Sequence, residues 1–250
     1  MRVLVLLTLA VSLVFVIWPG MDLAVSGWFY ARPGGFWRAA AAPYLWLREV
    51  IRWGGHLALI AALLIGLANL RLGSQQKTGW RVWLFGVASG VVGPGLLVNG
   101  ILKPLVGRAR PADLAEFGGS RAFTPAFQIT DQCAASCSFT SGEAALVAAV
   151  AIPVVLVLWP NLARGGRVWL LGLAGIYMTV GAGLRVVMGR HFLSDAVLSV
   201  LFCAIIAVIL YRAMAIGAAR QQFRSSEIFG DLGRIGTAAL AGTMRLVRRQ

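Results

Sequence analysis

Residues 144–163 read AALVAAVAIPVVLVLWPNLA and contain no charged side chain. A membrane-spanning helix needs about 20 mostly apolar residues, because the hydrocarbon core is about 30 Å thick and each helical residue adds about 1.5 Å. Five further uncharged apolar stretches cover 3–18, 53–70, 82–102, 168–184 and 196–211. We therefore expect an all-α, polytopic membrane protein with six transmembrane helices in one bundle, accompanied by interfacial helices.

The composition supports this fold class and excludes a soluble domain. Of the 250 residues, 59% are hydrophobic and 13% are charged, whereas a soluble domain carries about 25% charged residues. The net charge of +14 fits either the arginine bias of cytoplasmic loops or a site for an anionic substrate. Nucleic acid is not an expected partner, because the cations lie between the apolar stretches and not in one solvated domain.

The distribution of lysine and arginine predicts the orientation in the bilayer. With the N-terminus inside, the more basic connections and the basic tail 213–250 lie on the cytoplasmic side. We expect residues 1–212 to form the membrane domain, with both termini cytoplasmic. Residues 232–249 are predicted as either a basic interfacial helix or a solvated, partly disordered segment, and the aromatic segment 19–54 as a short interfacial element.

Proline and cysteine positions add local expectations. Pro94 should kink or loosen the third span. Cys133 and Cys137 share one polar loop and can pair if that loop faces an oxidising compartment, although the spacing alone leaves the pairing open. Cys203 lies in an apolar run and is expected to be inert packing.

The segment 185–195 carries the groups expected of a nucleophile and its support. The chain has only two histidines, and one of them, His191, starts the last span with Asp195 four residues later. Residues i and i+4 share a helix face, so the carboxylate can hold one imidazole nitrogen and leave the other free to attack. Arg185 offers a planar fork for phosphate oxygens. The alternative is a snorkelling arginine and a histidine at an interfacial helix end.

Two earlier segments carry further groups that can bind an anion. Lys103 and Arg110 follow the third span, as either interfacial anchors or a pair of cations on a phosphate. Residues 140–143, Thr-Ser-Gly-Glu, open the fourth span, where a helix N-terminus presents free N–H groups and a positive dipole end. Ser141 can add a hydroxyl, and Gly142 allows close approach to the backbone. The same four residues also fit a capping box.

Together the three segments predict one phosphate site on one side of the membrane. Two distant histidines and few clustered carboxylates are a poor ligand set for a metal. Several cations and helix-end donors around one histidine are a suitable environment for a transferring phosphoryl group. The predicted chemistry is therefore phosphate-ester cleavage by a histidine nucleophile, without a metal.

These residues resemble the signature of the type 2 phosphatidic acid phosphatase family, which is related to the vanadium haloperoxidases. The signature reads Lys-x6-Arg-Pro, then Pro-Ser-Gly-His, then Ser-Arg-x5-His-x3-Asp, and the resemblance covers about 103–195 and, through the six-span layout, most of the chain. The matching positions are Lys103, Arg110, Pro111, Ser141, Gly142, Arg185, His191 and Asp195.

The resemblance implies a metal-independent phosphatase for lipid phosphates that needs no cofactor. His191 would attack phosphorus and form a phosphohistidine, Asp195 would orient it, and water would then release phosphate. The implied phosphate-binding residues are Lys103, Arg110, Ser141, Gly142 and Arg185. The implied catalytic residues are His191, Asp195 and Glu143.

The chain departs from the signature mainly in the second motif. Thr140 replaces proline, Leu184 stands where the third motif has serine, and Glu143 replaces the histidine that usually protonates the leaving group. A carboxylic acid donates a proton only while it is protonated, and nearby arginines favour its ionised form. Glu143 is therefore expected to act as an acid only if it is buried, as a base in the second step, or simply as a helix cap.

Residues 137–144, CSFTSGEA, and the long Phe- and Gly-rich loop 112–139 resemble more loosely a bacterial branch that includes lipid A phosphatases. This resemblance implies removal of phosphate from a membrane lipid at the periplasmic face of a bacterial inner membrane. Lipid A is the favoured substrate, followed by undecaprenyl diphosphate and phosphatidylglycerophosphate. A lipid phosphotransferase and a non-catalytic phospholipid-binding or transport protein are the alternatives. The oligomeric state stays open.

Overall fold

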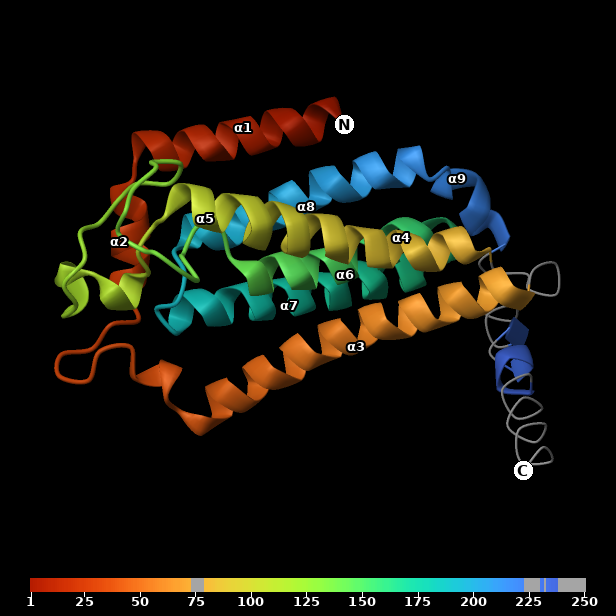
Figure 1. The fold of residues 1–250 in the computed structure, drawn as a ribbon, viewed down its shortest axis with the longest axis horizontal. Coiled ribbons are helices and arrows are strands. Elements are labelled where there is room, and N and C mark those ends of the chain that lie inside the picture. The colour runs from red at the N-terminus through yellow and green to blue at the C-terminus, as the bar shows by residue number, and fades with distance from the viewer. Residues whose placement is uncertain (73–78, 223–229, 232, 238–250) are drawn as a thin grey trace.

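The computed structural model describes residues 1–72, 79–222, 230–231 and 233–237, and these form an all-α bundle (Figure 1). The main helices are α1 (Arg2–Ile17), α2 (Gly20–Gly27), α3 (Ala42–Leu72), α4 (Trp80–Gly90), η3 (Val91–Leu102), α5 (Lys103–Val106), α6 (Gly142–Leu158), α7 (Arg164–Val187), α8 (Leu193–Ala213) and α9 (Ile216–Ala219). Short 3-10 turns are η1 (Trp37–Ala39), η4 (Pro111–Asp113), η5 (Ala115–Phe117), η6 (Trp159–Asn161) and η7 (Arg220–Gln222).

Length and composition make five helical segments of the described chain candidates for crossing a membrane. These are Ala42–Leu72, Trp80–Asp113, Gly142–Asn161, Arg164–Val187 and Leu193–Ala213. Helices α1 and α2 form a sixth candidate if they count as one span, although they are bent by 81° at the break between them. The predicted all-α, polytopic fold is therefore confirmed, with five or six spans.

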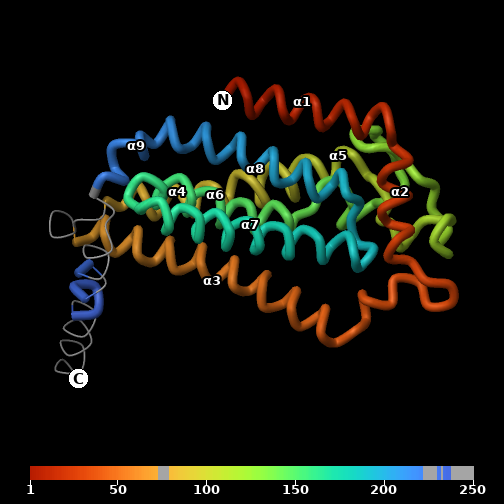
Figure 2. The backbone as a smooth tube through the Cα atoms, turned by 180° about the vertical axis from the view of Figure 1, so that it is seen from behind, coloured from red at the N-terminus to blue at the C-terminus, as the bar shows by residue number. Residues whose placement is uncertain are grey.

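Helix α6 lies at the centre of the bundle and contacts α3, α4, η3, α7 and α8. Its buried face is rich in alanine. In lipid there is no hydrophobic driving force between helices, so their association depends on close packing, which small side chains allow. Helix α2 and the loop between α5 and α6 gather at one end of the bundle, and α2 crosses the direction of the long helices there (Figures 1 and 2). The three motifs meet at this end.

The second span differs from its prediction. Helix α3 begins at Ala42, well before the predicted start at 53, so the end of the segment 19–54 belongs to a long helix and not to a separate interfacial element. An ion pair between Glu49 and Arg52, three residues apart, supports the added turns. As a result, α3 carries Arg48 and Arg52 toward the end of the bundle where the motifs meet.

The third span is loosened as predicted. Residues 91–102 form a π-helix with Pro94 inside it. Proline lacks a backbone N–H and clashes with the preceding turn, and a wider turn absorbs that conflict. The carbonyl of Pro94 accepts a hydrogen bond from the side-chain nitrogen of Asn99 at 2.7 Å, which fixes Asn99 next to the motif residues.

The residues that follow the last span pack back onto the bundle. Ile216 of α9 is fully buried in a cluster with Val82, Phe85 and Ala207. The predicted helix over 232–249 lies for the most part outside the described residues.

Gly181 is a test of how tightly α7 packs. A Cβ atom there would lie 2.7 Å from Cγ1 of Val147 on α6 and 3.2 Å from Cγ2 of Ile51 on α3. Gly181→Ala should therefore destabilise the protein by about 1–3 kcal/mol, because stiff, β-branched side chains would have to shift. Thermal unfolding in detergent measures this.

Gly183→Ala is the matched control in the same helix, since a Cβ at Gly183 would meet nothing within 4 Å. We expect its unfolding temperature to equal or slightly exceed that of the wild type, because alanine favours a helix more than glycine does. Equal stabilities of the two variants would contradict the packing described for α7.

Candidate functional site

A cavity of about 450 Å³ lies between α3, η3, α6 and α7 at the end of the bundle where the motifs meet. The polar and glycine residues on its wall near this end are Arg48, Arg52, His56, Asn99, Lys103, Arg110, Gly142, Glu143, Arg185, Arg190 and His191. Six of the eight predicted site residues are in this set. The other two, Ser141 and Asp195, are fully buried behind the wall.

The remaining part of the wall is apolar. It is formed by Leu59 on α3, Gly90 at the end of α4, Pro94 and Gly95 on η3, and Leu146 on α6. The cavity therefore changes from cationic near the motifs to hydrophobic along the helices. A second cavity, of about 320 Å³, lies between α3, α4 and α6 and is lined by side chains such as Val82 and Val157, which offer nothing to bind an anion.

His191 lies in the turn between α7 and α8. The N–H groups of Arg190 and His191 both donate to the carbonyl of Arg185, at 2.9 and 3.1 Å. Gly189 has φ +64°, and a Cβ there would lie 2.3 Å from the ring of Phe36, so only glycine fits this turn. The prediction that His191 belongs to the last helix is wrong, because α8 begins after it.

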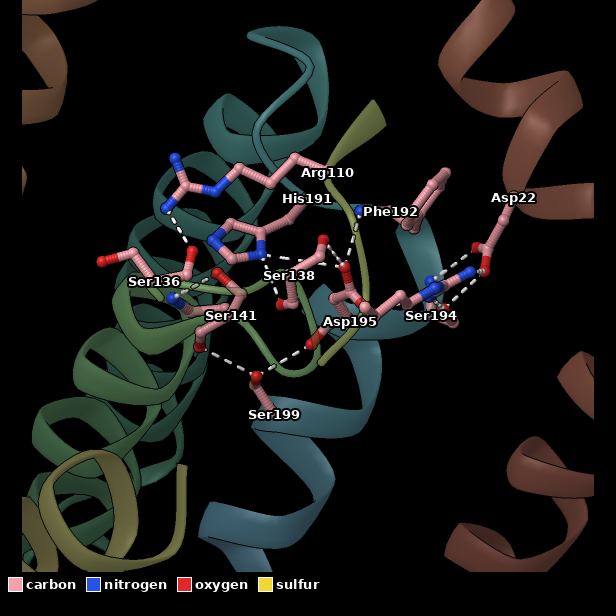
Figure 3. Close-up of polar contacts among 12 residues, drawn as sticks. Asp22, Arg110, Ser136, Ser138, Ser141, His191, Phe192, Ser194, Asp195 and Ser199 are labelled. Atoms are coloured by element: carbon pink, nitrogen blue, oxygen red, sulfur yellow. Dashed lines mark hydrogen bonds and ion pairs between the residues drawn. The ribbon is translucent and has the colours of Figure 1, made fainter. Parts of the chain in front are cut away.

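The tautomer of His191 follows from its hydrogen bond. Nδ1 of His191 lies 2.8 Å from the carbonyl oxygen of Ser138 (Figure 3). A carbonyl only accepts, so Nδ1 carries the proton and Nε2 keeps a free lone pair. Burial lowers the pKa of His191 to about 4, against the opposing effect of Asp195, so the imidazole is neutral near pH 7.

Asp195 is held behind His191 by several donors. Its Oδ2 accepts from the Phe192 N–H at 2.9 Å and from the Ser138 hydroxyl, and it lies 3.7 Å from His191 Nδ1. Its Oδ1 accepts from Arg108 at 2.9 Å. The carboxylate thus supports His191 together with the Ser138 carbonyl, whereas the sequence predicted that the carboxylate alone accepts a direct hydrogen bond from the imidazole.

The predicted cations Lys103, Arg110 and Arg185 meet on the cavity wall although they come from three segments of the chain. Nη2 of Arg110 donates to the Ser136 carbonyl at 2.7 Å. The Nε–H groups of Arg110 and Arg185 are buried without a hydrogen-bond partner among the described residues. Buried donors in folded proteins are normally satisfied, so these two groups indicate a place for an anionic ligand.

The loop that carries Ser136 is closed by a disulfide. Cys133 and Cys137 are bonded, with their Cα atoms 5.5 Å apart, which decides the pairing that the spacing had left open. Cys203 is free and buried against Val98 and Ala148, in agreement with a packing role.

Glu143 forms an ion pair across the cavity wall. Nε of Arg48 on α3 donates to its two oxygens at 2.9 and 3.0 Å, and Nη2 of Arg48 also donates to Oε1. Nε of Arg185 lies 3.5 Å from Oε2. The N-cap of α6 is Ser141, whose hydroxyl accepts from the Ala144 N–H at 3.3 Å. The arrangement places the carboxyl group of Glu143 beside Arg48 and Arg185 on the cavity wall.

Gly142 lets two polar side chains approach the start of α6. A Cβ at this position would lie 3.0 Å from Oδ1 of Asn99 and 3.4 Å from Nζ of Lys103. A side chain here would push Asn99 back by a few tenths of an ångström and would only touch Lys103, so glycine gives both groups their closest approach to the helix N-terminus.

Several site residues were not identified from the sequence. They are Arg48, Arg52, His56, Asn99, Arg108, Ser138 and Arg190, of which Arg108 and Ser138 contact Asp195 and the others line the cavity. Arg108, Ser138 and Arg190 lie within three residues of a motif position, and this proximity is the signal that could have identified them. Arg48 had no such signal, because it lies in an aromatic segment that reads as interfacial.

Comparisons with known proteins agree with the motifs. Residues 83–216 match the PAP2 superfamily. The chain is 30% identical over 203 residues to the lipid A 4′-phosphatase of Francisella tularensis subsp. novicida (strain U112), a match that covers 80% of this chain and 89% of that relative. It is 36% identical over 138 residues to the lipid A 4′-phosphatase of Rhizobium leguminosarum, covering 55% of this chain and 56% of the relative. No solved structure gives a significant match.

The superfamily match covers more than half of the chain and includes all three motifs, together with the residues that line the cavity from η3, α6 and α7 but not those of α3. The resemblance stated from the motifs is therefore confirmed, and the chain belongs to the PAP2 superfamily.

Proposed function

We propose that this protein is a metal-independent lipid phosphatase that removes the 4′-phosphate of lipid A through a phosphohistidine at His191. The observation that carries the proposal is the cavity in which a neutral, oriented histidine faces three cations, two of which have buried N–H groups without a hydrogen-bond partner among the described residues. Membership of a phosphatase superfamily supports the reaction class. Relatives named lipid A 4′-phosphatase support the substrate.

Lys103, Arg110 and Arg185 would hold the phosphate. The three cations line one cavity, and Nε of Arg185 lies 3.5 Å from Oε2 of Glu143. A phosphate dianion offsets their mutual repulsion and supplies acceptors for the free donors. In the five-coordinate transition state the equatorial oxygens carry more charge, so the same donors favour that state over the substrate.

In the first step, the lone pair on His191 Nε2 forms a bond to phosphorus. The bond from phosphorus to the lipid oxygen breaks, the electron pair leaves with that oxygen, and the oxygen takes a proton from water in the cavity. Nδ1 keeps its proton on the Ser138 carbonyl, so the imidazole becomes cationic. Asp195, 3.7 Å from Nδ1, stabilises that charge.

In the second step, water attacks phosphorus and the N–P bond breaks, which returns the lone pair to Nε2. Glu143 is suited to take the proton of that water, because it lines the same cavity as His191 and hydrogen bonds from Arg48 hold its carboxyl group there. Glu143 therefore serves in our proposal as the base for hydrolysis and not as the acid of the first step. Inorganic phosphate and the lipid alcohol are the products.

The shape and polarity of the cavity suit an amphiphilic substrate. The cationic part would take the phosphate on a sugar headgroup, and the apolar part along Leu59, Pro94 and Leu146 would contact acyl chains or the apolar edge of the headgroup. We place the cavity at the periplasmic face of the bacterial inner membrane, with both termini cytoplasmic. The arginine excess on the opposite side of the spans supports this orientation.

The test is phosphate release by purified protein in detergent with EDTA present. The substrates are lipid A species that carry only the 4′-phosphate or only the 1-phosphate, with undecaprenyl diphosphate and phosphatidylglycerophosphate beside them. We expect EDTA-resistant, vanadate-sensitive release from the 4′ species. A phosphorylated lipid product without inorganic phosphate would instead establish a phosphotransferase, and vanadate binding without either product a binding protein.

His191→Ala should lower kcat by at least about three orders of magnitude, as for other deleted nucleophiles. The reason is that phosphate-ester hydrolysis is extremely slow without covalent help. Rapid quenching with labelled substrate should trap an acid-labile phosphoprotein in the wild type and none in the variant. A folded His191→Ala protein that retains a tenth of the activity would rule out this nucleophile.

The neutral state of His191 can be measured directly. Because the chain has only two histidines, labelled imidazoles give two sets of NMR signals, and His56→Gln assigns them. Burial lowers the pKa of His191 to about 4, so its signals should stay those of the neutral ring until the pH falls toward about 4. Titration near the ordinary value of about 6.5 would contradict the buried geometry.

Glu143→His tests the base. A base must be unprotonated to work, so the acid side of the pH profile for hydrolysis of the phosphohistidine, followed by rapid quenching, should move to higher pH, by up to about 2 units, because imidazole ordinarily titrates near 6.5 and a glutamate carboxyl near 4.3. Both proteins are assayed with the same substrate, so ionisation of the substrate affects the two pH profiles equally. An unchanged profile would remove Glu143 from the proton chemistry. Glu116→Gln, at an exposed position, is the control for losing one carboxylate.

A further inference from the structure

A buried ionic network lies behind His191 and Asp195, centred on Arg108. The side chain of Arg108 has no exposed surface. Its Nη1 donates to Asp195 Oδ1 and to the Ser194 hydroxyl, both at 2.9 Å, and its Nε donates to the Thr124 carbonyl at 2.8 Å. The guanidinium also lies over the ring of Phe192, 3.9 Å from its centroid. Arg108 is therefore held on every side and faces neither the cavity nor a lipid.

The second carboxylate in the network comes from the N-terminal part of the chain. Asp22 on α2 accepts from Arg108 Nη2 at 2.9 Å through Oδ2, and from the Ser194 N–H at 2.9 Å through Oδ1. The Ser194 hydroxyl also donates to Asp22. Figure 3 shows Asp22 on a separate helix, with Ser194, Asp195 and His191 following in turn away from it; His191 lines the cavity. The residues matched to the superfamily begin only at 83.

The charges in this network have a consequence for His191. The carboxylates of Asp22 and Asp195 share the guanidinium of Arg108, so the three side chains together carry one net negative charge. Asp22 balances the charge of Arg108, and the charge of Asp195 remains. Without Asp22, the positive charge of Arg108 would be balanced by Asp195 alone, which would weaken the attraction between Asp195 and a cationic imidazole. The imidazole becomes cationic when Nε2 bonds to phosphorus while Nδ1 keeps its proton.

We propose that Asp22 and Arg108 are positioning residues for this reaction, which hold Asp195 in place and preserve its charge for His191. The inference rests on the proposed phosphohistidine chemistry. It gives α2 a role in supporting the active site. The hydrogen bonds from Ser194 to Asp22 also fix the first turn of α8, and Asp195 lies on that turn. Neither residue touches substrate, so their effect should fall on the chemical step and not on phosphate binding.

The test compares Asp22→Asn with Asp22→Glu in the full-length protein, with activity expressed per vanadate-binding site. Asp22→Asn keeps the size of the side chain and removes its charge. We expect kcat to fall about 10–100-fold, as for other groups that orient a reacting residue from behind, with KM within about twofold of the wild type. Rapid quenching should show slower formation of the phosphohistidine. Asp22→Glu restores the charge and should recover part of the loss.

Two controls separate this role from general damage. Ser26→Ala changes a buried side chain of the same helix outside the network, and Glu116→Gln removes an exposed carboxylate from the neighbouring loop. Both should keep the kcat of the wild type. A purely structural role for Asp22 would lower the number of vanadate-binding sites and leave kcat per site unchanged, and that outcome would overturn the proposal.

A second variant covers the case in which Asp22→Asn is not recovered folded. Ser194→Ala removes the hydroxyl that bridges Arg108 and Asp22, and it should lower kcat at unchanged KM; a wild-type kcat would overturn the proposal. Failure of the proposed function is distinguishable, because it would show in the wild type itself as vanadate binding without an acid-labile phosphoprotein.

Discussion

The site depends on how one buried carboxylate, Asp195, is neutralised. A charge removed from water is costly unless it is paired and hydrogen-bonded, and Asp195 has no exposed surface. Its partners are Arg108 before the long loop, Ser138 within it, and the Phe192 N–H at the start of α8. Satisfying this single charge therefore brings the first motif segment, the loop and the last helix together, and His191 is placed as a consequence.

A second pairing, between Arg48 and Glu143, joins α3 to the start of α6 in the wall of the cavity. The two ion pairs differ in setting. The Arg108 network is fully enclosed and supports the histidine, whereas Arg48 and Glu143 line the cavity and are partly exposed. The enclosed pairing suits a fixed orientation. The partly exposed one places a carboxyl group on the cavity wall, at a position where the family signature has histidine.

The loop between α5 and α6 contributes backbone as well as side chains. The carbonyl of Ser136 accepts from Arg110, and the carbonyl of Ser138 accepts from His191. A main-chain acceptor can set a tautomer without carrying charge, which leaves Asp195 to act electrostatically. The disulfide between Cys133 and Cys137 closes the turn that presents the Ser136 carbonyl. Function here depends on loop geometry supported by rigid helices.

The amino-acid sequence by itself determined the all-α, polytopic fold, the loosened span around Pro94 and the family. Long apolar stretches have few stable solutions in lipid, and eight motif positions occur in a recognisable order. Only the tertiary structure decided that Arg48 meets Glu143, that Arg108 lies between Asp22 and Asp195, and that Ser138 fixes the histidine tautomer. These partners are separated by 53 to 95 residues. Near the end of an apolar helix, an arginine that anchors the helix and an arginine that pairs with a distant carboxylate have the same local sequence. The two differ only in the Coulomb energy between the arginine and a carboxylate, and only folding brings those groups together.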